Sequence, residues 1–143
     1  MTPEIAVNIW ARSVIGLPFA WGETDCGVLT LKALSQLTGT NWVTPFGGAW
    51  RDEREALAHF EQMIPSQVLQ ERGAVEVSPS AVVFGDVITV PAPPWPEQCH
   101  FVFGRFCLVS DIKSGVRLLP SRLFTRLPGA RVWRVAPCLK PSQ

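Results

Sequence analysis

Cys26 is the residue of this chain with the clearest potential for covalent chemistry. It follows the run Trp21-Gly22-Glu23-Thr24-Asp25 and precedes an apolar stretch with helical spacing. The first turn of a helix offers unpaired N–H groups and a positive dipole end, which stabilise the nucleophilic thiolate. The turn before it would leave the sulfur beside a groove. We therefore predict a nucleophile at Cys26, with Trp21, Gly22 and Asp25 around its site and Asp25 suited to cap the helix. Taken alone, a cysteine at a helix start is also compatible with a small buried hydrophobic residue.

A cysteine nucleophile needs a base, and the sequence offers two histidines. His59 lies in a predicted charged helix whose outer face is solvated. His100 lies in a predicted strand and is the candidate base. For a third residue that orients the imidazole, the next strand offers Ser110 and Asp111, although Asp111 also suits the turn that ends at Gly115.

The surroundings of these residues resemble those of a known family. The segment Gly16-Leu17-Pro18-Phe19-Ala20-Trp21-Gly22-Glu23-Thr24-Asp25-Cys26-Gly27 resembles the nucleophile region of NlpC-type cell-wall peptidases, in which G-x-P-[YF]-x-[WY]-G leads into D-C-S-G. Phe84-Gly85-Asp86-Val87-Ile88 looks like the family's G-D-[LV] strand entry, and the strand from Cys99 to Gly104 follows where the family places its histidine. The resemblance implies a papain-like fold and cleavage of bacterial cell-wall peptides by a cysteine, a histidine and a polar residue.

Two departures from this pattern narrow the resemblance. Gly27 stands where the family usually has serine, and only two residues separate Gly22 from Asp25. This compact form resembles a branch of the superfamily found among phage and prophage tail genes, up to the Trp133-Arg134-Val135 end. The implied partners are other tail-tip proteins and bacterial cell-wall peptides, and the implied location is the virion tail, or the host cytoplasm before assembly.

The register of the His100 strand decides whether the base reaches Cys26. In the peptidases the histidine begins a run of the form H-V-G-I-Y-x-G. If Gly104 is the last glycine of that run, the base position falls on Gln98, and His100 is displaced by two residues, about 6.6 Å along the strand and beyond hydrogen-bond reach. If the strand is instead shorter at its far end, His100 meets Cys26 directly. Both registers remain open, although the amide of Gln98 could not act as a base.

Helices are predicted in the first half of the chain. Thr2-Pro3 starts a helix over about 3–15, Cys26 starts a second that ends at Gly39, and helices over 52–63 and 66–72 follow a loop at 40–50. The second half contains short β-branched and aromatic runs, predicted as strands: Val75–Val77, Asp86–Val90, Cys99–Phe103, Phe106–Ser110, Val116–Leu119 and Arg131–Val135. Proline cannot donate into a ladder, so residues 91–96 are predicted to be an extended, exposed loop. This order predicts a single α+β domain over 1–143, with helices packed on a small antiparallel sheet.

Composition narrows the classes of function. Thirteen basic and twelve acidic residues give a net charge of +1, which argues against a nucleic-acid partner. No signal peptide and no membrane span are predicted from the N-terminal stretch. The four cysteines, at 26, 99, 107 and 138, lack the spacing of a metal site, so buried thiols without metal or cofactor are expected. Six tryptophans, eight phenylalanines and thirteen prolines suit either an aromatic core or a docking surface.

Three hypotheses follow from the sequence. In the first, the chain is a tail-tip or baseplate protein that cleaves peptidoglycan peptides with Cys26 and His100. In the second, the same fold is a structural adaptor whose catalytic apparatus has lapsed and whose surfaces bind neighbouring tail subunits. In the third, which no residue favours, the fold carries a cytoplasmic acyl-transfer enzyme.

Overall fold

The computed structural model describes residues 1–46 and 50–135, without the side chains of residues 45 and 46. Its helices are α1 (Pro3–Val14), α2 (Cys26–Thr38), α3 (Val43–Phe46), α4 (Glu53–Gln62), α5 (Pro65–Glu71) and α6 (Arg122–Thr125), with a single turn η1 at Pro79–Ala81. Its strands are β1 (Val75–Val77), β2 (Val87–Ala92), β3 (Trp95–Phe103), β4 (Phe106–Asp111), β5 (Gly115–Pro120) and β6 (Arg131–Arg134). None of the helices in these ranges is long and apolar enough to cross a membrane.

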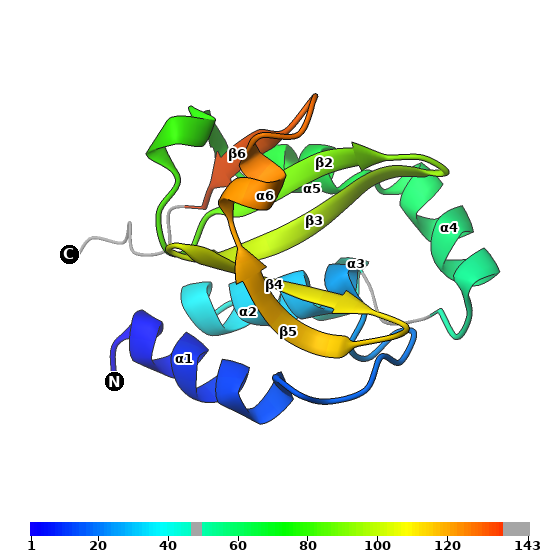
Figure 1. Cartoon of the computed structure of the whole chain (residues 1–143), viewed down its shortest axis with the longest axis horizontal. Helices are drawn as coiled ribbons and strands as arrows, with labels where there is room; N and C mark the ends of the chain where they lie inside the picture. Colours follow the sequence, from blue (N-terminus) through cyan, green and yellow to red (C-terminus); the bar gives the residue numbers. More distant parts are fainter. Residues whose placement is uncertain (47–49, 136–143) are drawn as a thin grey trace.

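The strands form one antiparallel sheet in the order β1-β6-β2-β3-β4-β5. The predicted α+β class is therefore confirmed, and Figure 1 shows α1 and α2 side by side on one face of the sheet. On this helix-side face, Cys99, Phe101 and Trp133 pack with residues of α1 and α2 such as Val7 and Leu34. Burial of these apolar side chains holds the helices on the sheet.

The opposite face of the sheet carries α6, which lies in front of β2 and β3 in Figure 1. Ile88, Val102 and Val109 form a second cluster there, and Phe124 of α6 packs against it. We call this the α6-side face. Because both faces are covered, four successive residues of β3, from Cys99 to Val102, are all buried.

The prediction of a loop over 91–96 was wrong, although Pro91, Pro93 and Pro94 are exposed as predicted. Strand β2 continues through Pro91 to Ala92, which pairs with Trp95 at the start of β3, and only Pro93-Pro94 forms the turn. The ladder tolerates Pro91 because the register shifts between Val90 and Ala92, so no N–H is needed there. The resulting long hairpin carries Trp95 toward the groove described below.

Strands β3 and β4 diverge after a short region of contact. They pair only at Val102 with Cys107 and at Phe103 with Phe106, next to their turn. Beyond these pairs the strands separate, as Figure 1 shows. The N-terminal end of α2 lies against this opening, because its first residue contacts Ser110 of β4.

Candidate functional site

The loop that leads into α2 is fixed by two buried side chains, Thr24 and Asp25. The Thr24 hydroxyl accepts from Ala20 N (2.7 Å) and donates to Pro18 O (2.8 Å), which closes the loop onto itself. Asp25 is the N-cap of α2, where it accepts from Val28 N at 3.0 Å. The same carboxylate accepts from Gly22 N (2.7 Å) and from the indole N–H of Trp50 (2.8 Å). The predicted helix start at Cys26 is confirmed, and the motif before it works as a rigid entry into the helix.

The Cys26 thiol is bonded to the backbone of β4. Its S–H donates to Ser110 O at 3.4 Å, and Ser110 N donates to the sulfur at 3.3 Å. In a regular sheet these two backbone groups would pair with the neighbouring strand. Because β3 diverges from β4 at this point, the sulfur bonds to the two backbone groups in place of a neighbouring strand.

This environment favours the neutral thiol. The pKa of Cys26 is raised to about 12, mainly by burial and to a smaller degree by the negative charges of Asp25 and Asp111, against the hydrogen bond from Ser110, which lowers it. A useful cysteine nucleophile has a lowered pKa, through a neighbouring cation or a helix N-terminus. Here the helix N-terminus is outweighed, and at neutral pH Cys26 carries its proton.

A groove of about 390 Å³ opens beside Cys26, between the diverging ends of β3 and β4. Its walls include four aromatic rings, from Phe19, Trp21, Phe60 and Trp95. The Trp21 and Trp95 rings lie roughly parallel with their centroids 6.0 Å apart, and Phe60 meets Trp95 edge-on at 6.0 Å. Gln98, Ser110 and Asp111 also line the groove, so the structure gathers most of the predicted site residues around it.

The structure explains why residue 27 is a glycine. A Cβ at this position would lie 2.5 Å from the outermost carbon of the Phe60 ring. The serine of the peptidase pattern would therefore displace Phe60 of α4, which covers the first turn of α2. The departure at Gly27 is thus coupled to an aromatic side chain that narrows the groove.

His100 does not meet Cys26, which corrects the predicted dyad. It pairs with Ile88 and so lies on the α6-side face, whereas its neighbour Cys99 faces the helices. Its Nδ1 is 3.2 Å from Leu108 O, its ring packs at 4.3 Å on Phe124, and its Nε2 is buried without a partner among the described residues. Both predicted registers assumed that His100 and Gln98 face the helices. The observed strand is shifted by one residue relative to them, and such a shift moves every side chain to the other face.

The buried imidazole predicts a pH-dependent stability. Burial lowers the pKa of His100 from 6.5 to about 4, against the hydrogen bond to Leu108, which raises it. The unfolded chain therefore binds the proton more readily, and stability is full above about pH 6.5 and falls as the pH drops toward about 4. We expect His100 to contribute a loss of about 3 kcal/mol in the free energy of unfolding over this range.

Urea unfolding at a series of pH values, for the wild type and for His100→Phe, measures this effect. The variant lacks the titrating group, so its stability should fall less steeply between about pH 6.5 and 4.5. Equal slopes for the two proteins would show that His100 titrates in the folded state as it does in the unfolded chain.

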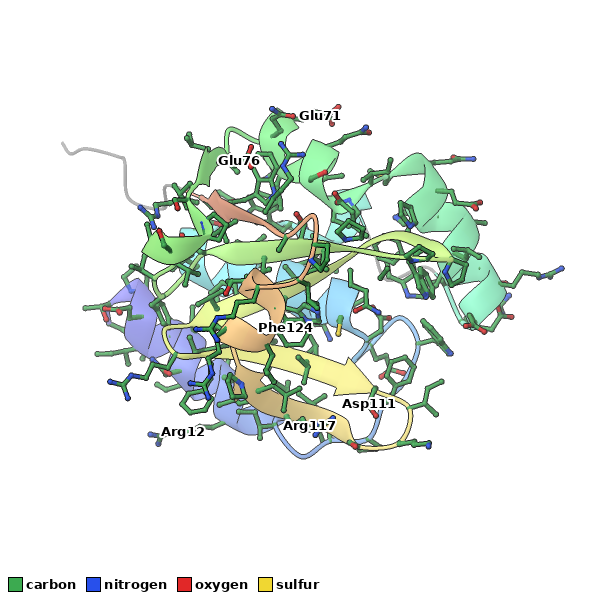
Figure 2. The ribbon with its side chains drawn as sticks, turned by 45° about the horizontal axis from the view of Figure 1, so that its top comes forward. Arg12, Glu71, Glu76, Asp111, Arg117 and Phe124 are labelled. Atoms are coloured by element: carbon green, nitrogen blue, oxygen red, sulfur yellow. The ribbon has the colours of Figure 1, made fainter. Side chains whose placement is uncertain are left out.

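The two residues predicted to orient the imidazole, Ser110 and Asp111, do not contact His100 through a hydrogen bond. Asp111 accepts from Lys113 N (3.0 Å) and Ser114 N (2.8 Å), and pairs with Arg117 at 3.2 Å, as Figure 2 shows at the β4–β5 turn. The Ser110 hydroxyl is buried without a partner among the described residues. Neither side chain orients the imidazole, because the Nδ1 of His100 lies at Leu108 O and its Nε2 has no partner among the described residues.

The remaining cysteines and His59 add no second catalytic set. Cys99 is buried on the helix-side face, Cys107 on the α6-side face, and both are free thiols. Burial raises the pKa of each to about 12. Cys138 lies outside the described residues. Within the described ranges no group of histidine, cysteine and carboxylate side chains could hold a metal ion. The His59 ring contacts Trp50, with the ring centroids 4.7 Å apart.

Three aromatic residues of the site were missed by sequence reasoning. Trp50 anchors Asp25, while Phe60 and Trp95 line the groove. Phe60 lies in the predicted helix over 52–63 and Trp95 in the predicted loop over 91–96, and neither prediction places them at the site. The abundance of tryptophan in so short a chain was the available signal, but it does not say which rings meet.

Comparison with known proteins gives a family and no function. Residues 4–135 match the model of a family described as a domain of unknown function, DUF6950. The match covers most of the 143 residues, so the chain belongs to this family. No curated protein matches the sequence.

Proposed function

We propose that this chain is a tail-tip or baseplate protein of a bacteriophage or prophage, with an NlpC-type papain-like fold that no longer cleaves peptides. In this proposal the groove beside Cys26 binds an apolar segment of a neighbouring tail protein. The resemblance of residues 16–27 to the peptidase motif supports the fold, together with a cysteine at the start of a helix that packs on an antiparallel sheet.

The protonated, hydrogen-bonded state of the Cys26 thiol is the main observation in favour of lost catalysis. Peptide cleavage by cysteine needs a thiolate and an adjacent base that delivers a proton to the leaving amine. The thiol instead donates a hydrogen bond to Ser110 O, and the nitrogens of His100 make no bond to the sulfur. The sulfur has a structural role, because it satisfies two backbone groups of β4 that would otherwise lose their partners.

The walls of the groove favour binding of an apolar segment. Large aromatic side chains supply much apolar contact area for little loss of side-chain freedom, and they often dominate the energy of protein interfaces. Trp21 and Trp95 are both partly exposed and stack at the groove mouth. A neighbouring protein that packs an apolar side chain against their exposed edges would bury these rings.

The alternative is a cysteine peptidase that cleaves bacterial cell-wall peptides. The position of Cys26 at a helix start and at the wall of a groove favours it. It requires a base that reaches the sulfur, and His100 would have to cross from one face of the sheet to the other.

Hydrolysis of cell-wall peptides by the wild type and by Cys26→Ala separates the two. We expect neither protein to release product above the background of the peptides alone, while an active cysteine peptidase of the same class serves as positive control. We also expect Cys26→Ala to lose about 2 kcal/mol of stability, because Ser110 N and O lose their partner. Turnover by the wild type that disappears in Cys26→Ala would establish the peptidase instead.

Binding through the groove is tested with the tail proteins encoded beside this chain, co-expressed and purified with it. Trp95→Ala should weaken complex formation with one of them, whereas Ile9→Ala, at an exposed site on α1, should leave it unchanged. If both variants bind as the wild type does, the groove is not the docking site.

A further inference from the structure

A second hollow, of about 900 Å³, shares no lining residue with the groove beside Cys26. It is bounded by α6, by the β3–β4 turn and by the segment that carries η1. Three arginines, Arg105, Arg122 and Arg126, line it, and its apolar wall comes from Val82, Val83 and Phe84. We call it the arginine hollow.

The three arginines of the hollow have no counter-ion. All three are exposed, and within the described ranges their guanidinium groups make no hydrogen bond and no ion pair. No acidic residue lines the hollow. Arg122 and Arg126 stand about one helical turn apart, a spacing at which like charges repel. An uncompensated positive field therefore fills this surface in the free protein.

Two acidic residues of the sheet region already form ion pairs with other arginines. Asp86 pairs with Arg134 at 2.9 Å, and Glu76 pairs with Arg131 at 2.9 Å. Figure 2 shows Glu71 and Glu76 at the β1 edge, well away from Phe124 of α6. Within the described residues, no carboxylate of the chain therefore balances the charge of the hollow.

The walls of the arginine hollow are held in place. Ser121, which is buried, donates from its backbone N–H to Arg105 O (2.8 Å) and from its hydroxyl to Gly104 O (3.1 Å), so α6 and the β3–β4 turn form one unit. On the other side, Arg134 bonds both Asp86 oxygens and Ala81 O, which fixes the η1 segment. A preformed surface loses less freedom when it binds.

Exposed apolar residues directly follow each of the three arginines in the sequence. The exposed fractions are 51% for Leu123, 43% for Leu127 and 45% for Phe106. Val83, in the wall, is 49% exposed. Such side chains beside unpaired arginines are typical of protein interfaces, in which arginine is enriched.

We propose that the arginine hollow binds an acidic segment of another protein, one whose carboxylates alternate with apolar side chains. The carboxylates pair with Arg105, Arg122 and Arg126, and the apolar side chains cover Val83 and the apolar wall around it. Bidentate pairing of arginine with carboxylate gives such a contact both strength and direction. This inference is independent of the groove beside Cys26, which lies on the helix side of the sheet.

A protein segment fits this surface better than a nucleic acid does. Binding to a nucleic-acid backbone requires a basic stripe or face, and the chain as a whole has a net charge of only +1. The positive charge here is confined to one hollow with an apolar wall. A small free anion would leave that wall and the exposed leucines uncovered.

The test selects short peptides from a displayed random library on the whole immobilised protein and measures the affinity of those enriched. We expect the enriched peptides to be net negative and to contain leucine or aromatic residues. The double variant Arg122→Glu/Arg126→Glu should bind them at least about tenfold more weakly. The matched control Arg12→Glu/Arg54→Glu changes the net charge equally, at exposed sites elsewhere, and should bind within about twofold of the wild type.

Several results would overturn the proposal. They are enrichment without a preference for negative charge, no enrichment at all, and an equal loss of affinity in the two double variants. Binding of a labelled DNA duplex at physiological salt that is lost in Arg122→Glu/Arg126→Glu would assign the hollow to nucleic acid instead. Thermal unfolding of each variant checks the fold, and Arg122→Gln/Arg126→Gln replaces the charge-reversed variant if that protein does not fold.

Discussion

Replacing Asp25 by alanine should lower the free energy of unfolding by about 4 kcal/mol. The carboxylate is 4% exposed and accepts three N–H groups, from Gly22, Val28 and Trp50. A buried donor left without a partner costs about 1–3 kcal/mol, and the helix also loses its cap. Urea unfolding at neutral pH measures the difference.

A matched control exists at α4. Asp52 caps that helix through Glu55 N at 2.9 Å, but on the exposed surface and with one bond from its side chain. Asp52→Ala should therefore cost only about 1 kcal/mol. Equal losses at the two positions would mean that Asp25 acts as an ordinary cap, and that its bonds to Gly22 and Trp50 contribute nothing.

The second large effect is expected at Arg134. Its side chain is partly exposed, but its partner Asp86 is 1% exposed and would keep only the bond from Val83 N in Arg134→Ala. Removing one partner of a buried ion pair leaves an uncompensated charge, which costs about 4 kcal/mol. Denaturant unfolding of the variant at neutral pH should show this loss.

Two further variants make this prediction specific. Arg117→Ala breaks the exposed pair with Asp111, in which each side chain is nearly half exposed, and should cost less than about 1 kcal/mol. Adding Asp86→Asn to Arg134→Ala removes the stranded charge and should restore part of the stability. If the double variant is less stable than Arg134→Ala alone, the loss has another cause.

Much of the fold could be predicted from the sequence, because the signals are local. The Thr2-Pro3 start of α1 and the Asp25 cap with Gly39 at the end of α2 are each encoded within a few residues. The strand runs are also found close to their predicted positions. The short helix α6 was missed, since a four-residue turn anchored by Phe124 depends on what it packs against rather than on its own pattern.

The site could be predicted only in part. Cys26 and its motif were located by sequence, as was the groove beside it. The parity of β3 could not be found, because Cys99, His100, Phe101 and Val102 are all buried and give no alternation of polar and apolar residues. The phase is set by tertiary packing, where Phe101 meets Phe84 and Phe103 on the helix side. A shift of one residue along β3 therefore decides whether the histidine faces Cys26 or is buried on the α6-side face.

The bond between Cys26 and Ser110 bears on how relatives of this chain are classified. A sulfur at this position can be required by two backbone groups 84 residues away in sequence, whether or not the protein has any chemistry to perform. In this chain, a cysteine after the tryptophan–glycine turn is therefore not in itself evidence of a nucleophile. On β3 of this chain, the side chain that faces the helices is Cys99, whereas His100 lies on the α6-side face.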